Sequence, residues 1–224
     1  MKKVLAIMAH PDDAEIRCFG TLMKLKKQGK IVRIIVATKG ENGKSLDNSR
    51  VEENLSSKRE KESMNAFVDA GIEVSFLNFP DGNITFCRDS IVTLEKYIND
   101  FKPEIVITHF VDNYGVDHQD HSNLGKCAIN VASRKSFVKQ VLLAEPTLTF
   151  KAGFQPNFFV DITDFFNQKV QALTKHETQD GREYLTKQFH ENRSAYYSNN
   201  VAYRQSSDSK NKYTEAFFCL FNCI

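Results

Sequence analysis

Two clusters of histidine and aspartate carry most of the chemistry that this sequence could perform. The first lies in HPDDAE, and its members are His10, Asp12 and Asp13. The second lies in DHQDH, and its members are Asp117, His118, Asp120 and His121. Imidazole nitrogens and carboxylate oxygens are ligands of catalytic zinc sites, in which three protein ligands leave one position open. The two clusters therefore predict one catalytic metal centre, provided that the fold brings them together.

The clusters contain more side chains than three ligand positions need. His10 and Asp13 can supply two ligands. His118 and His121 are three residues apart, so at the start of a helix both can face the metal and either can be the third ligand. The other histidine would act as a general acid or stabilise an oxyanion. The aspartate that is not a ligand would be free to take a proton from water activated by the metal.

Each cluster taken alone also has a plain structural explanation. HPDD fits the cap of a helix, and pairs of the type His-x-x-His occur on many surface helices. Their joint occurrence after two separate strands favours the metal centre, where a cation and a helix N-terminus would offset the repulsion between adjacent carboxylates. A nucleotide site is disfavoured because no G-x-G-x-x-G follows the first strand and GENGKS lacks the spacing of a P-loop.

The elements that position these clusters are strands alternating with amphipathic helices, a pattern typical of a parallel α/β sheet. We expect a mostly parallel sheet with the strand order 3-2-1-4-5. Its expected strands are residues 3–8, 30–38, 72–79, 103–110 and 141–145, and its expected helices are 13–28, 58–70, 89–101 and one that starts near 118 or 121. Weaker signals after residue 150 predict strands at 158–162 and 215–221 and helices at 164–175 and 182–197. Function collects where strand order reverses, and both clusters follow the strands that flank this crevice.

Composition excludes several classes of protein. The chain has 224 residues, and its 30 basic and 28 acidic residues give a formal net charge of +2. This balance offers no broad electrostatic surface for nucleic acid or for an anionic membrane. No apolar run reaches the roughly 20 residues that span a bilayer. The N-terminus lacks the cleavage site of a signal peptide, so we expect a cytoplasmic protein.

Longer segments of the sequence resemble the LmbE and PIG-L family of zinc-dependent N-acetylglucosaminyl deacetylases. AHPDDAE resembles the signature AHPDD[AE]E of that family, and DHQDH resembles its H-x-D-H signature. REKESMNAFVDAG, HETQ and KYTEAFF resemble further family motifs in the expected order. Together these matches cover most of the chain.

The resemblance implies a role for particular residues. The implied ligands of zinc, or of an alternative metal such as Fe²⁺, are His10, Asp13 and His121. The implied catalytic residues are Asp12 as general base, His118 as general acid or oxyanion stabiliser, and Asp120 as the carboxylate that orients His118. Arg59 and His176 would bind the substrate.

The resemblance also implies an architecture and an activity. The fold would be a Rossmann-like three-layer sandwich in a single domain, with a core over 1–150 and a C-terminal extension over 151–224 packed on it. The reaction would remove the N-acetyl group from an N-acetylglucosamine derivative, so the partner would be a small acetamido sugar. The family further suggests a homo-oligomer, with a hexamer among its forms.

Several points stay open at this stage. Arg17 and Phe19 occupy places where the family usually has glycine, which puts the access path near the metal and the substrate shape in question. Residues 39–57 are either a solvated loop or a lid. The aglycone could be a small acid, a nucleotide, an inositol lipid or an antibiotic core. A zinc amidohydrolase for a non-sugar amide and a non-catalytic metal- or sugar-binding protein are the rival functions.

Four side chains outside the two clusters receive structural interpretations. His109 ends an expected strand and is read as a satisfied strand-end histidine, and His190 is read as part of a helix surface. The Tyr196–Tyr197 pair is read as core.

Overall fold

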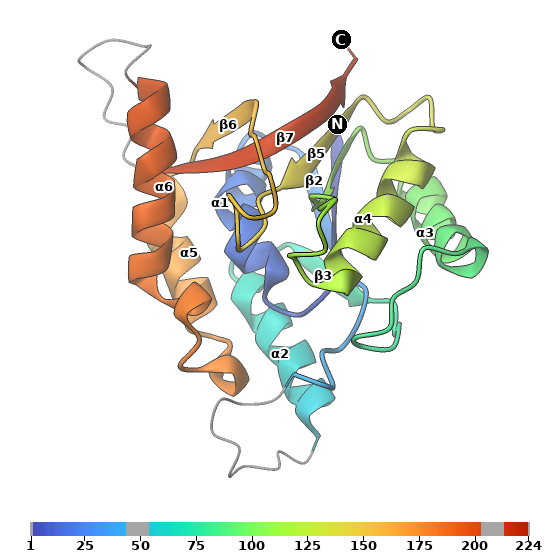
Figure 1. Cartoon of the computed structure of the whole chain (residues 1–224), viewed down its shortest axis with the longest axis horizontal. Helices are drawn as coiled ribbons and strands as arrows, with labels where there is room; N and C mark the ends of the chain where they lie inside the picture. The colour runs from blue at the N-terminus through green and yellow to red at the C-terminus, as the bar shows by residue number, and fades with distance from the viewer. Residues whose placement is uncertain (1, 44–53, 203–212, 224) are drawn as a thin grey trace.

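A single seven-stranded sheet organises the molecule. The computed structural model describes residues 2–43, 54–202 and 213–223, and its sheet has the order β3-β2-β1-β4-β5-β7-β6 (Figure 1). The strands are β1 (Lys3–Met8), β2 (Ile31–Val36), β3 (Glu73–Phe76), β4 (Ile105–His109), β5 (Gln140–Ala144), β6 (Phe158–Asp161) and β7 (Thr214–Asn222). The first five strands lie in the predicted order, β3-β2-β1-β4-β5, and are parallel to one another. β7 runs antiparallel to both β5 and β6. The predicted order 3-2-1-4-5 is confirmed, and two strands extend the sheet.

Helices cover both faces of this sheet and give the predicted three-layer sandwich. They are α1 (Asp13–Lys27), α2 (Leu55–Phe67), α3 (Arg88–Phe101), α4 (Gln119–Ala132), α5 (Phe166–Leu173) and α6 (Lys187–Ala202). Because side chains alternate along a strand, Leu5 and Ile7 of β1 pack with α3 and α4, while Val4 and Ala6 pack with α1 and α2. The strand is apolar throughout because both of its faces are buried.

Several element boundaries differ from the sequence prediction: α2 covers 55–67 instead of 58–70, and α6 ends at 202 instead of 197. Two of the differences have a local reason. The third strand ends at Phe76 instead of residue 79, since Asn78 adopts a positive φ of 60° that turns the chain. The last long helix begins at Lys187 instead of residue 182. The Thr186 hydroxyl accepts the backbone N–H of Phe189 at 3.3 Å, which is how an N-cap starts a helix.

The C-terminal segment is bound to the rest of the chain through α1. Glu215 of β7 accepts the backbone N–H groups of Gly20 and Thr21 at 3.1 and 2.8 Å and pairs with Lys169 of α5 at 2.8 Å. A Cβ at Gly20 would lie 2.5 Å from Ile162, so only glycine permits this approach. The segment also shares the sheet with residues 1–150, while the division of 1–224 into core and extension stays a prediction.

Residues 39–57 were predicted to be either a solvated loop or a lid, and residues 44–53 of this segment lie outside the described residues. Within the described ranges, none of the helices combines the length and the apolar character that crossing a membrane requires.

Candidate active site

The two histidine and aspartate clusters meet at the carboxyl ends of β1 and β4. A cavity of about 500 Å³ lies there, which we call the crevice. Its lining includes His10, Asp12, Asp13, Arg17, Arg59, Asp81, Asp117, His118 and His121. Burial of the apolar strands thus brings together side chains that are about a hundred positions apart, as expected where strand order reverses.

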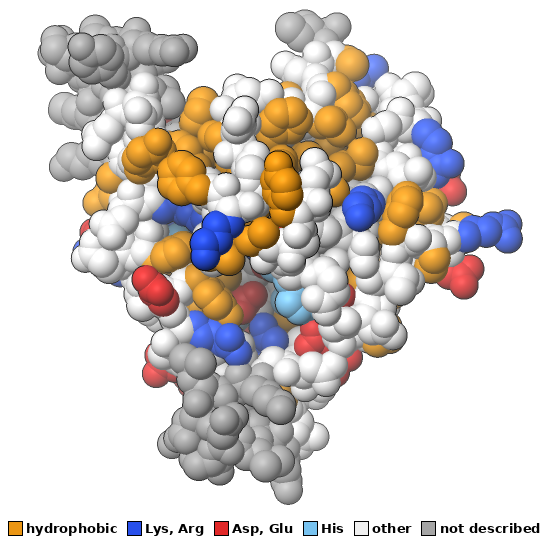
Figure 2. Space-filling model, viewed as in Figure 1, with side chains coloured by type: hydrophobic (Ala, Val, Ile, Leu, Met, Phe, Trp, Pro, Cys, Tyr) orange, Lys and Arg blue, Asp and Glu red, His pale blue; other side chains and the backbone are white. Residues whose placement is uncertain are grey.

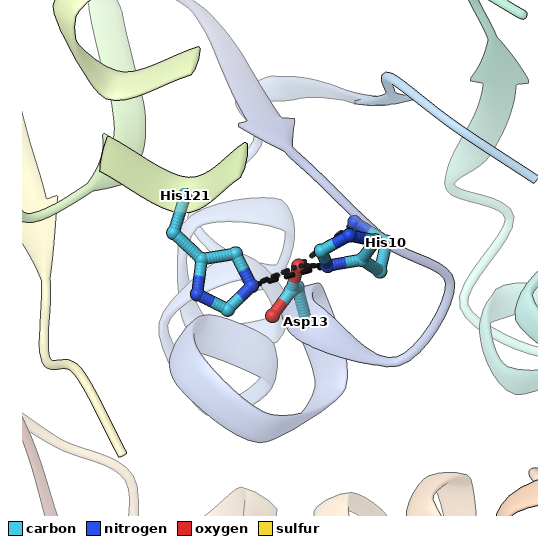
Figure 3. Close-up of side chains that lie close together, drawn as sticks. All are labelled: His10, Asp13 and His121. Carbon is cyan, nitrogen blue, oxygen red and sulfur yellow. Dashed lines mark hydrogen bonds and ion pairs between the residues drawn. The ribbon is translucent and has the colours of Figure 1, made fainter. Parts of the chain in front are cut away.

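Three of these side chains point their ligand atoms at one another (Figure 3). His10 Nδ1 lies 3.1 Å from His121 Nε2, and Asp13 Oδ2 lies 3.4 Å from each of these nitrogens. A tetrahedral zinc ion with bonds of about 2.0–2.1 Å holds its ligand atoms about 3.3 Å apart. The spacing of the three atoms therefore matches one face of such a site.

The ring nitrogens of the two histidines that face away from the triangle contact charged side chains. His10 Nε2 lies 3.1 Å from Asp81 and 3.2 Å from Asp120; although burial opposes the shift, Asp120, Asp13 and Asp81 raise the pKa of His10 well above its usual value. His121 Nδ1 lies 3.0 Å from Asp117 and 3.0 Å from Arg17 Nη2. A divalent cation at the triangle would replace any proton on the two facing nitrogens, because a histidine must be unprotonated at the nitrogen that binds a metal. The residues present fit a divalent metal.

A second group of donors, His10, His118 and Asp120, also lies close enough to hold an ion. The two members that are not shared with the first group, Asp120 and His118, already accept backbone hydrogen bonds. Both Asp120 oxygens accept backbone N–H groups, from Gly82 at 2.7 Å and from Ile84 at 2.9 Å. His118 Nδ1 accepts the N–H of Asp120 at 3.2 Å. The first group is therefore the better candidate.

Arg17 holds the ligand triangle in place from beneath. Its Nε donates to Asp13 at 3.1 Å, its Nη1 donates to the Glu145 carbonyl at 2.7 Å, and its Nη2 lies 3.0 Å from His121 Nδ1. The side chain is almost completely buried. Burial alone raises the pKa of Asp13, but His121 and His109 outweigh it and hold that pKa well below its usual range. Asp13 is therefore a carboxylate that is available to a metal.

Asp12 occupies a strained position beside this triangle. Its φ of 115° is rare for a residue with a side chain, and its carboxylate is buried. Burial raises the pKa of Asp12, against the opposing charge of Arg59. The Arg59 guanidinium donates to Asp12 at 3.2 Å and to the carbonyls of Pro11 and Gly40 at 2.8 and 2.9 Å. Arg59, predicted to bind substrate, thus holds the Asp12 loop through Nη2 and the loop after β2 through Nη1, while it also lines the crevice.

His118 and Asp120 are related differently from the sequence prediction. Asp120 was expected to orient His118, but its carboxylate lies 4.0 Å from His118 Nδ1 and 3.2 Å from His10 Nε2. Because two backbone N–H groups fix this carboxylate, it cannot turn towards His118 without losing them. The contacts therefore place Asp120 behind His10, a candidate metal ligand. Burial and the charges of His10 and His121 lower the pKa of His118.

His176, predicted to bind substrate, does not line the crevice. It is buried, and its Nε2 lies 2.9 Å from Glu15; although burial opposes the shift, Glu15 raises the pKa of His176. Its neighbour Gln179 does line the crevice. Glu62 of α2 accepts the N–H and hydroxyl of Thr178 at 2.9 and 2.7 Å. These contacts fix the segment that presents Gln179.

Several side chains at the site were not assigned a role from the sequence. Asp81 and Asp117 support the two histidine ligands, and Arg17 supports Asp13. The four-residue spacing from Asp13 to Arg17 is the signal that could have been used for the latter. His109 accepts the Ala9 N–H at 2.9 Å and its ring stacks on His121 at 4.3 Å. Its Nδ1 is buried without a hydrogen-bond partner among the described residues, so the interpretation as a satisfied strand-end histidine holds for Nε2 alone.

The chain is similar to known proteins over most of its length. The family described as PIG-L, GlcNAc-PI de-N-acetylase, matches residues 5–132, which include both clusters. A diacetylchitobiose deacetylase from Thermococcus kodakarensis is 30% identical over 188 residues, covering 80% of this chain and 70% of that protein.

Solved structures share the fold over almost the whole chain. A 4-carboxy-2-hydroxymuconate hydratase from Pseudomonas putida has a TM-score of 0.83 at 22% identity, covering 100% of this chain and 98% of that one. An N,N'-diacetylchitobiose deacetylase from Pyrococcus horikoshii has a TM-score of 0.80 at 25% identity, covering 98% and 84%. The similarity to the hydratase is evidence for the fold only, because proteins of one fold can have many different activities.

Proposed function

Because this chain belongs to the PIG-L (LmbE-like) family of deacetylases, we propose that it is a zinc-dependent hydrolase that removes the N-acetyl group from an N-acetylglucosamine derivative. The observation that carries the proposal is a spare carboxylate, Asp12, beside a triangle of metal-ligand atoms. A protein that only binds a metal needs no such group. The substrate class is taken from relatives whose names specify diacetylchitobiose and N-acetyl-alpha-D-glucosaminyl L-malate.

A bound divalent cation would supply a Lewis acid that polarises the amide carbonyl and acidifies the attacking water. His10, Asp13 and His121 would hold it, with Asp120 and Asp117 orienting the two imidazoles. Arg17 would keep Asp13 ionised and correctly turned. These residues make the crevice a preorganised site.

Asp12 would act as the general base. It lines the same crevice as the ligands, and Arg59 fixes its carboxylate. As the water oxygen bonds to the acetyl carbon, Asp12 accepts the proton that the water releases. The C–N bond then breaks and the proton passes from Asp12 to the leaving nitrogen. The products are acetate and the free amine.

His118 would stabilise the charge that develops on the carbonyl oxygen. Its Nδ1 accepts a backbone N–H, which places the ring proton on Nε2. An Nε2–H group at the rim of the crevice can donate to an oxygen as its negative charge grows. The half-exposed ring leaves room for substrate to approach.

The test is acetate release by the metal-loaded protein from a panel of N-acetylglucosamine conjugates. Asp12→Asn should lower kcat by about 10²–10⁴-fold while the bound metal, measured by elemental analysis, is retained. Asp164→Asn, at an exposed carboxylate, is the matched control and should keep full activity. Acetate released equally by Asp12→Asn would remove Asp12 as the base.

The same panel separates the rival functions. No release from any sugar, with metal firmly bound, would favour an amidohydrolase for another amide or a binding protein. The proposal keeps zinc as the metal and Fe²⁺ as its alternative, because this ligand set binds either. It also keeps the expected cytoplasmic location. The homo-oligomer rests on the sequence resemblance, and sedimentation of the purified protein tests the assembly.

A further inference from the structure

A second cavity lies beside the crevice and takes no part in the chemistry described so far. It has a volume of about 680 Å³, and we call it the aromatic groove. The loop after β5 and helix α6 form its walls, which include Phe150, Phe189, Tyr196 and Tyr197. A cavity of this size and character is typical of sites for small organic molecules.

The aromatic side chains of the groove form an exposed apolar surface. Phe150 is 83% exposed and Tyr196 is 53% exposed, although large apolar side chains are usually covered. Their rings meet edge to face with centroids 6.4 Å apart, and Tyr196 contacts Tyr197 at 5.3 Å. The sequence interpretation of both tyrosines as core is correct for Tyr197, which is buried, and wrong for Tyr196. The surface is thus built from rings that a flat apolar ligand could cover.

The charged side chains of the groove balance one another. Glu145 lies 3.2 Å from Arg193 and accepts the hydroxyl of Tyr197 at 2.7 Å, so both charges of this pair are satisfied internally. Lys151 and Glu183 add one exposed charge of each sign. An acidic or phosphorylated ligand would gain no net attraction here. The groove therefore favours an uncharged ligand.

The groove and the crevice are neighbours with a common wall. Thr147 and Leu148 line both cavities. On the opposite side, Tyr184 lines the crevice while the adjacent Glu183 lines the groove. In Figure 2, hydrophobic side chains cover the upper part of the face and reach down to the hollow in which a histidine is visible. A molecule held in the crevice could therefore extend into the groove.

We propose that the aromatic groove binds an uncharged aromatic aglycone on the acetamido sugar that the crevice hydrolyses. The inference rests on the proposed function, and it narrows the substrate class to aryl glycosides of N-acetylglucosamine. Acidic aglycones such as malate or phosphate are disfavoured by the charge balance of the groove. The sugar ring occupies the crevice, and the aglycone crosses the Thr147–Leu148 wall.

The experiment compares three substrates of the metal-loaded protein: the phenyl and methyl β-glycosides of N-acetylglucosamine, and N-acetylglucosamine 1-phosphate. The phenyl glycoside should have a kcat/KM about tenfold above the methyl glycoside, since covering one ring contributes at least that factor. Phe150→Ala and Tyr196→Ala should each reduce this ratio severalfold. Tyr97→Ala, on α3 and outside both cavities, is the matched control and should leave the ratio unchanged.

A binding measurement keeps this inference separate from the deacetylase. Phenyl β-glucoside has no acetamide, so its binding, followed by calorimetry, reports the groove whether or not hydrolysis occurs. Binding that Phe150→Ala weakens, without acetate release from any sugar, would support the groove and refute the deacetylase. Equal kcat/KM for phenyl and methyl glycosides would refute the groove and leave the deacetylase standing.

Two further outcomes would overturn the inference. Preference for the 1-phosphate over the phenyl glycoside would show that the groove selects charge. A change of sedimentation coefficient in Phe150→Ala or Tyr196→Ala, from an oligomer to a smaller species, would show that a second copy of the chain covers these rings.

Discussion

The crevice and the aromatic groove share a wall, yet the crevice is lined by buried charged side chains and the groove by exposed aromatic ones. In the crevice, charged side chains are buried and hold one another through short contacts, as Arg17 holds Asp13 and Asp120 holds His10. In the groove, the rings of Phe150 and Tyr196 stand exposed. Charges fixed in advance serve a chemical step, because they need no reorganisation when the reaction occurs. Exposed rings serve binding, because covering them is favourable whatever the exact shape of the ligand. Substitutions should therefore be costly in the crevice and mild in the groove.

The largest effect should follow from removing a metal ligand in the crevice. Asp13→Ala should weaken zinc binding by more than about 100-fold, the upper range for losing a residue that merely supports a ligand. Competition with a chromophoric chelator measures the affinity directly. Asp164→Ala, an exposed carboxylate, should bind zinc as the parent does. Stoichiometric, undiminished zinc on Asp13→Ala would place the metal elsewhere.

The next effect concerns the buried cation of the crevice. Arg17→Met should destabilise the metal-free protein by roughly 3–5 kcal/mol, because it leaves Asp13 and Asp117 buried without their positive partner. Urea unfolding measures this loss, and added zinc should recover part of it. Arg33→Met removes an exposed pair with Glu73 and should cost less than about 1 kcal/mol. Similar losses in both variants would mean that burial does not distinguish the two arginines.

A smaller effect should appear in the pH dependence of the free energy of unfolding, through a buried histidine of α6. His190 of α6 is buried, contrary to its interpretation as helix surface, and its Nε2 lies 2.9 Å from the Tyr184 carbonyl. Burial, with the charges of Lys169 and Arg193, holds the pKa of His190 well below its usual value.

The sign of this dependence follows from proton binding. The unfolded chain takes up a proton on this histidine near pH 6.5, where the folded protein keeps the ring neutral. The stabilising contribution of neutral His190 to the free energy of unfolding is therefore complete above about pH 6.5. It is lost as the pH falls towards the lower pKa of the folded state, by up to about 1.4 kcal/mol per pH unit. His190→Gln should lose this part of the slope between about pH 7 and pH 5 in urea unfolding. Parallel curves for the two proteins would contradict the assignment.

The smallest effect on the free energy of unfolding should come from removing an exposed ring of the groove. Phe150→Ala should change the free energy of unfolding by less than about 0.5 kcal/mol, since the exposed ring gains little from folding. Phe166→Ala, at a ring that is 1% exposed, should cost about 3–5 kcal/mol in the same assay. A large loss from Phe150→Ala would show that the groove, like the crevice, is part of the rigid structure.

The same contrast explains what the sequence could predict. The crevice comes from two compact motifs that follow β1 and β4, and strand order alone brings their residues together. Which carboxylate supports which histidine depends on loop geometry, so Asp120 was paired with His118 when it contacts His10. The burial of His176 and His190 depends on packing between distant segments, which local patterns do not encode. The groove depends on such packing throughout, and its Tyr196–Tyr197 pair was interpreted as ordinary core although Tyr196 is exposed.

The position of β7 in the sheet has a consequence for how the protein is made. β7 lies between β5 and β6, yet it is the last of the seven strands to be synthesised. Until residue 222 has left the ribosome, β5 presents an unpaired edge with the apolar sequence VLLA, a pattern prone to pairing with other chains. The ligand clusters are complete by residue 121, a hundred residues before the edge next to β5 is closed. Chaperone dependence and aggregation of nascent chains should therefore be decided by β7, long after both histidine and aspartate clusters have been translated.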